Sequence, residues 1–284
     1  MPGPGLPAEH PGRLLAELRL APRKRLGQVF LHDRNNARKI VSLAAGMGPP
    51  FLEIGPGLGA LTVPLAEGGY STLGVEVDGR LAAFLRERLA GSSVEVMEAD
   101  FLSVPGKEWE RRFPGGGTVL GNLPYSASSP IVLRLLDLRE TFPRAVVMLQ
   151  KEVASRLCAR PGGKEYGTLS VYLGALAEAR EEFPVRRTCF TPPPDVDSTV
   201  ISIRFRQGVP DALVRDLRTV VRCAFARRRK TLKNAPVPFL AGGTEQWCEL
   251  LSRAGIDPGS RAEAVSPEGY LVLARSLPER GGNR

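Results

Sequence analysis

The chain has 284 residues, of which 43% are hydrophobic and 24% are charged. This composition excludes an intrinsically disordered protein, and the length allows one large domain and one smaller domain. Lysine and arginine outnumber aspartate and glutamate by 39 to 30, which gives a net charge of +9. The excess favours a polyanionic partner, nucleic acid before a membrane surface. A solvated, arginine-rich surface without such a partner would give the same balance.

Cysteine and histidine usage argues against a metal centre and against a disulfide framework. The histidines, His10 and His32, are distant in sequence from every cysteine, and the cysteines form no CxxC pair: Cys158, Cys189, Cys223 and Cys248. Free thiols in a reducing compartment are therefore expected. No run approaches the roughly 18 apolar residues of a membrane span, and the N-terminus lacks a secretory signal pattern. The sequence predicts a cytoplasmic, metal-free protein without a membrane anchor, and nothing in it indicates a stable oligomer, so a monomer is expected.

The N-terminal region divides into a tail and a basic stretch. Residues 1–12 are rich in proline and glycine and are predicted to be a disordered tail. From Arg13 to Lys39 there are eight basic residues against Glu17 and Asp33, a local excess of +6.

Short apolar runs then alternate with helical patterns. The predicted helices include Leu58–Glu67 and Arg80–Ala90, and the predicted strands are Phe51–Gly55, Thr72–Val77, Val94–Glu98, Thr118–Asn122 and Ala145–Leu149. Apolar strands separated by amphipathic helices indicate a parallel sheet covered on both faces. Ligands of such doubly wound α/β folds bind at the carboxyl ends of the strands.

The pattern changes after Phe183. The alternating run Thr199–Phe205 predicts a late antiparallel strand, and Gly208 with Pro210 indicates a linker. Three helical patterns follow, at 211–226, 246–254 and 267–277. The sequence therefore predicts an α/β domain over residues 13–207 and a small all-helical domain over residues 208–284.

A glycine-rich turn, EIGPGLG at 53–59, follows the first strand and opens a helix. Glycine lets the backbone turn tightly and approach a ligand, and the start of a helix offers unpaired amides. Dinucleotides, nucleotides and S-adenosylmethionine are all bound by such turns. Pro56 disfavours a dinucleotide, because a pyrophosphate is held by backbone amides and proline has none. Gly55 and Gly57 are the candidate cofactor contacts.

Two acidic residues narrow the choice of ligand. Glu76 ends the second strand, 21 residues after Gly55, the spacing at which an acid binds ribose hydroxyls. Asp100 follows the third strand, where it can accept a hydrogen bond from an adenine amino group. Either acid alone is more often a helix cap or a solvated loop residue. Together with the glycine turn they indicate S-adenosylmethionine.

The tetrapeptide Asn122-Leu123-Pro124-Tyr125 follows the fourth strand and suits chemistry on an exocyclic amine. Such an amine is a poor nucleophile because its lone pair is delocalised into the ring. The Asn122 side-chain carbonyl and the Leu123 backbone carbonyl can accept its hydrogens and direct the lone pair towards a methyl sulfonium. Pro124 fixes the turn, and Tyr125 offers a face for a stacked base, worth about 1–3 kcal/mol. A proline turn beside a core tyrosine is the alternative.

From about residue 22 to residue 280 the sequence resembles the bacterial ribosomal RNA adenine dimethyltransferases of the KsgA family. The motifs that carry the resemblance are RLGQVFL at 25–31, EIGPGLGALT at 53–62, GNLPY at 121–125, LQKEVASRL at 149–157, YGTLSV at 166–171, FTPPPDVDS at 190–198, AFARRRKTLKNA at 224–235, and GIDP with RAE at 255–263. The resemblance implies a Rossmann-like S-adenosylmethionine-dependent methyltransferase domain, which needs no metal, followed by a small helical domain.

The resemblance also assigns expected roles to single positions. The positions implied to contact the cofactor are Gln28, Val29, Leu31, Gly55, Gly57, Glu76, Asp100 and Asn122. The positions implied to hold and stack the target adenine are Asn122, Leu123, Pro124 and Tyr125. Phe190 matches an aromatic that would close over the other face of the flipped base.

An RNA substrate follows from the same resemblance. The residues implied to grip it are Arg23, Lys24 and Arg25 at the N-terminus and Arg227, Arg228, Arg229 and Lys230 in the second domain. Taken alone, the second run is equally typical of a solvated helix face. The family modifies two adjacent adenosines in a hairpin loop near the 3′ end of 16S-type small-subunit RNA, and dimethylates each late in subunit assembly. The expected partner is therefore small-subunit RNA within a precursor of the small ribosomal subunit.

One position departs from the family pattern. The family usually has an asparagine that contacts the cofactor where this chain has Val29. Valine supplies no such hydrogen bond, so the expected affinity for S-adenosylmethionine is lower by about 0.5–1.5 kcal/mol.

Three other functions are compatible with parts of the sequence. A non-catalytic assembly factor of the same fold is opposed by the intact NLPY tetrapeptide, Glu76 and Asp100. An Erm-type methylase of large-subunit RNA is opposed by the Pro192–Ser198 segment and the motif at 224–235. A nicotinamide oxidoreductase is opposed by the lack of an obvious catalytic acid or base.

Overall fold

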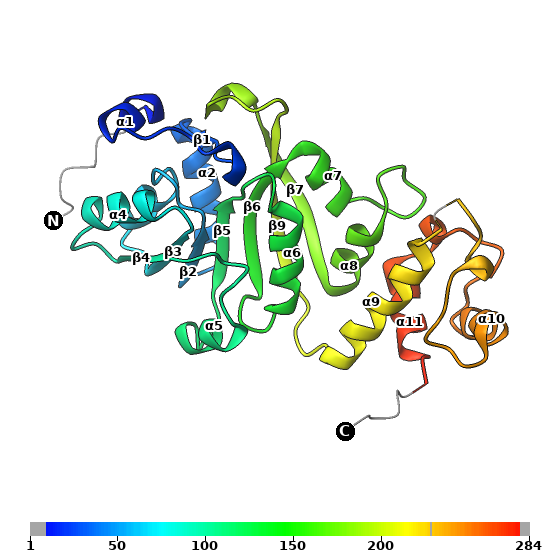
Figure 1. Cartoon of the computed structure of the whole chain (residues 1–284). Helices are drawn as coiled ribbons and strands as arrows, with labels where there is room; N and C mark the ends of the chain where they lie inside the picture. The colour runs from blue at the N-terminus through cyan, green and yellow to red at the C-terminus, as the bar shows by residue number, and fades with distance from the viewer. Residues whose placement is uncertain (1–9, 228, 279–284) are drawn as a thin grey trace. The chain divides into compact units, whose positions relative to one another are not determined.

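The computed structural model describes residues 10–227 and 229–278 (Figure 1). Contacts within the chain divide it into two compact units. Unit 1 comprises Met1–Ala154 and Arg180–Gln207, and unit 2 comprises Ser155–Ala179 and Gly208–Arg284. The segment Ser155–Ala179 therefore differs from the sequence prediction, which placed it in the first domain. Its helix α8 (Thr168–Leu176) packs on two helices of unit 2, α9 (Asp211–Phe225) and α11 (Pro267–Arg275).

Within its described residues, unit 1 is built on a seven-stranded sheet in the order β4-β3-β2-β5-β6-β9-β7. The strands are β2 (Phe51–Ile54), β3 (Thr72–Glu76), β4 (Val94–Glu98), β5 (Thr118–Asn122), β6 (Arg144–Gln150), β7 (Ala177–Val185) and β9 (Ser198–Phe205). Strands β2 to β6 pair in parallel, and β9 pairs antiparallel with β6. The predicted fold class, a mostly parallel sheet with a late antiparallel strand, is confirmed.

Helices cover the sheet, which explains why its central strands are buried and mostly apolar. Every residue of β2 and β3 is buried, as is usual when both faces of a parallel sheet are covered. Helix α2 (Arg34–Ala45) packs against β5 and β6, and α4 (Gly79–Arg88) lies beside β3 and β4 (Figure 1). The other helices of unit 1 are α1 (Pro11–Glu17), α3 (Thr62–Glu67), α5 (Gly106–Arg112) and α6 (Ser128–Asp137), and α7 (Lys151–Leu157) crosses its boundary.

The strand order creates a crevice between β2 and β5. From β2 the chain continues to β3 and β4 on one side, whereas from β5 it continues to β6 on the other. The loops after these two strands therefore diverge, and ligands of doubly wound folds bind at such a point. Gly121 allows the close approach of the strands, because a Cβ atom there would lie 2.6 Å from the carbonyl oxygen of Ile54. Gly55 and Asn122, which end the two strands, thus meet at the crevice.

The N-terminal prediction needs a correction. The expected disordered tail over residues 1–12 does not hold for Pro11 and Gly12, which form the first turn of α1, while residues 1–9 lie outside the described residues. Proline suits the first position of a helix, and the Nδ1 atom of His10 accepts a hydrogen bond from the Gly12 amide at 3.2 Å. The apolar side of α1 is buried in a cluster of Leu14, Leu15, Phe30, Leu58 and Leu81.

Unit 2 is helical, as predicted for its C-terminal part. Its described helices after Gly208 are α9, α10 (Gly243–Arg253) and α11, close to the three predicted patterns. Trp247 is fully buried and donates a hydrogen bond from Nε1 to the Leu232 carbonyl at 3.0 Å. The hydroxyl of buried Tyr270 donates to the Ala262 carbonyl at 2.9 Å. These bonds tie the loops of unit 2 to its helices.

Three further properties of the described residues bear on the sequence predictions. Among them no helix is both long enough and apolar enough to cross a membrane. Nor do residues 10–227 and 229–278 contain a group of three or more histidine, cysteine, aspartate or glutamate side chains that could hold a metal ion. The four cysteines are free thiols.

Candidate functional site

A pocket at the crevice between β2 and β5, here called the main pocket, collects most of the predicted site residues. Those that line it are Gln28, Val29, Leu31, Gly55, Gly57, Glu76, Asn122, Leu123 and Pro124. Asp100 lines a second pocket, here called the side pocket. The two pockets share Leu26, Gly55, Val77 and Pro124. They therefore adjoin, and Asn122 lines only the main pocket whereas Asp100 lines only the side pocket.

The glycine turn after β2 is held to the end of β3. Gly55, Gly57 and Gly59 have φ angles of 68°, 60° and 90°, the left-handed region that favours glycine. The Gly57 amide donates a hydrogen bond to Oε2 of Glu76 at 2.9 Å. A Cβ atom at Gly57 would lie 3.3 Å from the ring of Phe30. The turn thus packs against Phe30, and both line the main pocket.

Glu76 occupies the position predicted for an acid that binds ribose. Only 4% of the residue is exposed, and its Oε1 accepts a hydrogen bond from the Asp78 amide at 2.9 Å. Burial raises the pKa of the Glu76 carboxyl, and the amides of Asp78 and Gly57 oppose that rise. The carboxyl is therefore fixed in orientation while it faces the main pocket.

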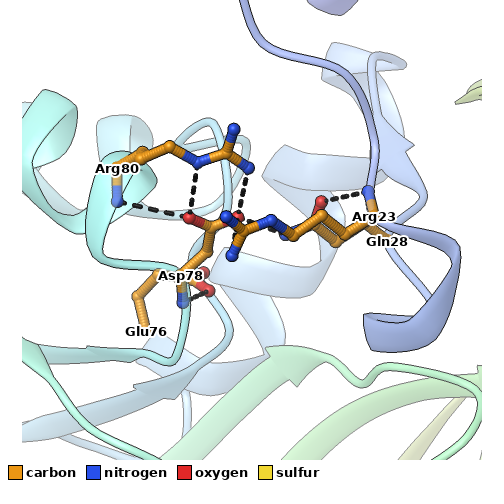
Figure 2. A network of polar contacts seen from close by, with 5 residues as sticks. All are labelled: Arg23, Gln28, Glu76, Asp78 and Arg80. Atoms are coloured by element: carbon orange, nitrogen blue, oxygen red, sulfur yellow. Dashed lines mark hydrogen bonds and ion pairs between the residues drawn. The ribbon is translucent and has the colours of Figure 1, made fainter.

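Asp78, which the sequence analysis did not select, is the centre of a polar network (Figure 2). Its carboxylate accepts hydrogen bonds from Gln28 Nε2 at 3.3 Å and from the Arg80 guanidinium at 2.9 Å, and it lies 3.4 Å from NH1 of Arg23. The Arg80 side chain in particular lowers the pKa of Asp78 to about 2. The Arg23 amide in turn donates to Oε1 of Gln28 at 2.8 Å. The network fastens the segment from Arg23 to Gln28 to the end of β3.

Replacing Asp78 with asparagine should loosen this segment. The change leaves both arginines without their anion, but they are 37% and 42% exposed, so we expect a loss of only about 1–2 kcal/mol and a Tm lower by a few degrees. Because the folded pKa of about 2 lies below the ordinary 3.8, the wild-type advantage is complete above that value and disappears as the pH falls through 2.

Thermal unfolding between pH 2 and pH 7 measures this difference. Asp195→Asn, at an exposed aspartate, is the matched control and should leave the Tm unchanged. A Tm difference between wild type and Asp78→Asn that is the same at every pH would contradict the ion-pair account.

Asn122 presents a fixed acceptor to the main pocket. Its Nδ2 donates a hydrogen bond to the Val29 carbonyl at 3.0 Å. Its Oδ1 is buried and accepts no hydrogen bond from the residues that the structure describes. The Leu123 amide donates to the Met148 carbonyl at 3.1 Å, and Leu123 is fully buried, so the turn that carries Asn122 is anchored to β6. A buried acceptor without a donor indicates a ligand N–H at this place.

The two predicted stacking residues differ in their environment. The Tyr125 hydroxyl is 2.8 Å from Oγ of Ser198, and burial raises the pKa of its phenol. Phe190 lies in the short strand β8 (Phe190–Thr191), which pairs with β1 (Phe30–Leu31). Only 2% of Phe190 is exposed, and it packs in the core with Leu31, Met148 and Val200. Stacking of Phe190 on a base stays a prediction.

The predicted RNA contacts also differ in their environment. Arg23 is engaged by Asp78, whereas Arg25 is exposed and lines the side pocket beside Asp100. The exposed cations that follow α9 are Arg227, Arg229 and Lys230. The side chain of Lys24 and the whole of Arg228 lie outside the described part of the chain.

Glu53 is the main residue of the site that the sequence analysis passed over. It lies in β2, is 2% exposed and lines the main pocket. Burial, helped by the neighbouring Glu76 carboxylate, raises the pKa of Glu53 to about 8. An acidic residue inside an otherwise apolar strand was the available signal, because a buried carboxyl without a cation is costly.

These features fit S-adenosylmethionine. The main pocket offers the carboxyl groups of Glu53 and Glu76 to a cofactor that carries positive charge, and a buried acceptor without a donor, Asn122 Oδ1. The side pocket combines the Asp100 carboxylate with apolar surface from Ile54, Val77 and Phe101, which suits adenine. The cofactor would thus lie along both pockets.

Comparisons with known proteins identify the family of the chain. Residues 19–278 match a family described as ribosomal RNA adenine dimethylase. The chain is 43% identical to ribosomal RNA small subunit methyltransferase A of Geobacter sulfurreducens over 92% of this chain and 97% of that protein. It is 44% identical to the protein of the same name from Pelotomaculum thermopropionicum, over 93% and 94%.

Solved structures show the same architecture. A dimethyladenosine transferase from Plasmodium falciparum is similar with a TM-score of 0.71 and 26% identity, over 86% of this chain and 95% of that one. The 23S rRNA methyltransferase ErmE is similar with a TM-score of 0.63 and 29% identity, over 87% and 99%.

The fold and the site define a Rossmann-like methyltransferase that uses S-adenosylmethionine. The chain belongs to the ribosomal RNA adenine dimethylase family, and its activity is S-adenosylmethionine-dependent dimethylation of adenine in ribosomal RNA. The predictions of family, enzyme class and cofactor are confirmed, which sets aside the nicotinamide oxidoreductase and the non-catalytic assembly factor.

Substituting asparagine for Val29 should tighten binding of S-adenosylmethionine. Val29 lines the main pocket, and the backbone carbonyl that holds Asn122 is kept in the variant. One added neutral hydrogen bond is worth about 0.5–1.5 kcal/mol, so calorimetry should show a Kd lower by roughly twofold to tenfold. Val29→Leu is the control without a polar group. An affinity for Val29→Asn that is unchanged or weaker would show that position 29 does not reach the cofactor.

Proposed function

We propose that this enzyme dimethylates two adjacent adenosines in a hairpin loop near the 3′ end of small-subunit ribosomal RNA, within a precursor of the small ribosomal subunit. The relatives that are 43% and 44% identical are both named for the small subunit, whereas ErmE, named for 23S RNA, is 29% identical. This difference favours small-subunit RNA over the Erm-type alternative. A cytoplasmic location and a monomeric state belong to the same proposal.

One observation supports the chemistry most directly, the buried Oδ1 of Asn122 whose orientation is fixed by the bond from Nδ2 to Val29. This oxygen would accept one hydrogen of the adenine amine, and the Leu123 carbonyl would accept the other. The lone pair would then point into the main pocket, where the bound cofactor supplies an electrophilic methyl group. Alignment of this kind can provide about 7–11 kcal/mol of the barrier without a general base. Pro124 keeps the turn rigid, and Tyr125 supplies a stacking face.

The cofactor contacts follow from the two pockets. Glu76 would accept hydrogen bonds from the ribose hydroxyls, and Asp100 would accept one from the cofactor adenine. Oxygens of Asp100 already accept from the Leu102 amide at 3.0 Å and the Ser103 hydroxyl at 3.2 Å, which keeps the carboxylate in place. The other proposed contacts are Gln28, Val29, Leu31, Gly55 and Gly57.

The exposed cations that follow α9, which are Arg227, Arg229 and Lys230, are proposed to bind RNA phosphates. Replacing Arg229 and Lys230 with alanine should weaken RNA binding and reduce its salt dependence, because each lost phosphate contact removes about 0.7–0.9 from the slope of log K against log salt. The double variant Lys107→Ala, Arg111→Ala removes the same charge from unit 1 and is the control. If both variants keep the wild-type slope in filter binding from 50 to about 200 mM salt, the run after α9 is only a solvated surface.

Methyl transfer to purified subunits tests the proposed substrate. Small subunits that lack the modification, and separately large subunits, are incubated with tritiated S-adenosylmethionine, and reverse transcription then locates dimethyladenosine. We expect label in the small subunit only, at two adjacent adenosines near the 3′ end. Label confined to large-subunit RNA would establish the Erm-type alternative. Tight binding of small subunits without any label would contradict the proposed substrate.

A further inference from the structure

The main pocket carries acidic groups without a cation. Among its described lining residues, Glu53 and Glu76 are the ionisable side chains, and no lysine, arginine or histidine lines it. The neighbouring strand β5 (Thr118–Asn122) contributes no ionisable residue, and Glu67 of α3 lines a different pocket. The pocket therefore attracts a cationic group.

The two carboxyl groups differ in their partners. Both oxygens of Glu76 accept backbone hydrogen bonds, from Gly57 and from Asp78. Oε2 of Glu53 is buried and has no hydrogen-bond partner among the described residues. Glu53 is also fixed in the middle of the sheet, paired with Gly74 on one side and with Leu120 on the other. The Thr62 side chain stabilises the carboxylate form of Glu53 and partly opposes the rise in its pKa, but it leaves Oε2 without a donor. A buried carboxyl oxygen without a partner in the folded chain is one that a ligand can satisfy.

The position of Glu53 indicates which part of the cofactor it meets. Glu53 lines the main pocket together with Asn122 but does not line the side pocket, which contains Asp100. With the cofactor adenine at Asp100, the other half of the molecule lies at Glu53. That half carries the α-ammonium, the sulfonium and one α-carboxylate, so its net charge is positive.

We propose that Glu53 is the counter-ion of the cationic, methionine-derived half of S-adenosylmethionine, and that it makes the site bind the cofactor more tightly than the product S-adenosylhomocysteine. The inference rests on the assignment of the main pocket to the cofactor and is independent of which RNA is methylated. During transfer the S–CH₃ bond breaks and its electron pair stays on sulfur, while an N–CH₃ bond forms and the amine loses a proton to water. The sulfonium thereby becomes a neutral thioether, so the Glu53 carboxylate loses an attractive charge and takes up a proton from solvent.

This account links cofactor binding to proton release. Because the pKa of Glu53 is about 8 in the free protein, its carboxyl is mostly protonated near neutral pH. The sulfonium and ammonium stabilise the carboxylate form, so binding of S-adenosylmethionine releases close to one proton at pH 7. Binding of the product releases a smaller fraction, and its departure is favoured. Affinity for the cofactor rises with pH up to the pKa of Glu53.

Calorimetry with the two small molecules alone tests the proposal. S-adenosylmethionine and S-adenosylhomocysteine are each titrated into the full-length protein at pH 7, in two buffers of different ionisation enthalpy. Wild type is compared with Glu53→Gln and with Glu98→Gln, a strand-end glutamate of the same sheet that is exposed and lines neither pocket. Because glutamine has the shape of the protonated acid, Glu53→Gln is expected to keep the wild-type fold, which its Tm verifies.

We expect proton release with the cofactor in wild type and in Glu98→Gln, and none in Glu53→Gln. The Kd for S-adenosylmethionine should rise on the order of tenfold in Glu53→Gln, the effect of a lost hydrogen bond to a charged group, and the Kd for the product should rise less. Binding enthalpies that are identical in both buffers, or equal weakening of both ligands, would overturn the proposal. Failure of wild type to bind S-adenosylmethionine at all would instead contradict the assignment of the pocket.

Discussion

Replacing Asn122 with alanine should lower the rate of methyl transfer by two to three orders of magnitude or more while leaving the fold intact. The variant removes the buried Oδ1 that is proposed to accept an amine hydrogen, and loss of one such preorganised group costs on the order of 10²–10³ in kcat. It also removes the bond from Nδ2 to Val29. Single-turnover methylation of undermethylated small subunits, with dimethyladenosine quantified by mass spectrometry, measures the rate.

Two further variants separate orientation from charge. Asn122→Asp keeps an acceptor but places a carboxylate against the Val29 carbonyl. We therefore expect its rate of methyl transfer to be lower than that of wild type. Ser128→Ala removes a hydroxyl that donates to the Pro124 carbonyl at 3.0 Å in the same turn, and its rate should fall much less than that of Asn122→Ala. If Asn122→Ala retains more than about a tenth of the wild-type rate, the side-chain acceptor is not part of the chemistry.

The sheet and the outline of the site could be predicted because local patterns determine them. Buried strands such as β2 and β5 appear as short apolar runs, and glycines or prolines mark where they end. The carboxyl ends of parallel strands meet at one edge, so Gly55, Glu76 and Asn122 were expected to lie together, and all three line the main pocket. The start of α3 was predicted too early because Gly59, with φ of 90°, extends the turn before the helix begins at Thr62.

The partnerships between distant segments could not be predicted. Nothing local to Arg23 indicates that it pairs with Asp78, which is 55 residues further along the chain, and its expected contact with RNA stays a prediction. Stacking of Phe190 on the substrate base stays a prediction, but the pairing of β8 with β1 and the packing of Phe190 in the core could not be read from the sequence. Likewise, α8 joins unit 2 through contacts with α9 and α11 that a linear reading of residues 155–179 does not reveal.

Contacts at the crevice also link the proposed cofactor contacts to the proposed acceptor for the target amine, because both are positioned by the same strand ends. Asn122 is oriented by Val29 from the N-terminal segment, and that segment is fastened by Gln28 to Asp78 at the end of β3. Glu76 on β3 in turn holds the turn after β2. A displacement of one strand end therefore changes both the cofactor contacts and the acceptor for the target amine.

The spacing of β2 and β5 offers the strongest test of this dependence, through Gly121→Ala. The added Cβ would lie 2.6 Å from the Ile54 carbonyl oxygen and 3.3 Å from a methyl group of Leu123. The first contact is with backbone in the centre of the sheet, so the strands themselves must separate. We expect a loss of about 3 kcal/mol or more, a Tm lower by roughly 6–12 °C for a unit of this size, and weaker binding of S-adenosylmethionine, because the ends of β2 and β5 move apart.

Thermal unfolding and calorimetry on the same samples measure both effects. Gly115→Ala is the matched control, because a Cβ there meets no atom within 4 Å, and its Tm and Kd should equal those of wild type. A lower Tm with an unchanged Kd would mean that the crevice tolerates separation of the strands. An unchanged Tm would mean that the contact between Gly121 and Ile54 is looser than 2.6 Å, and the argument that glycine is required before Asn122 would then fail.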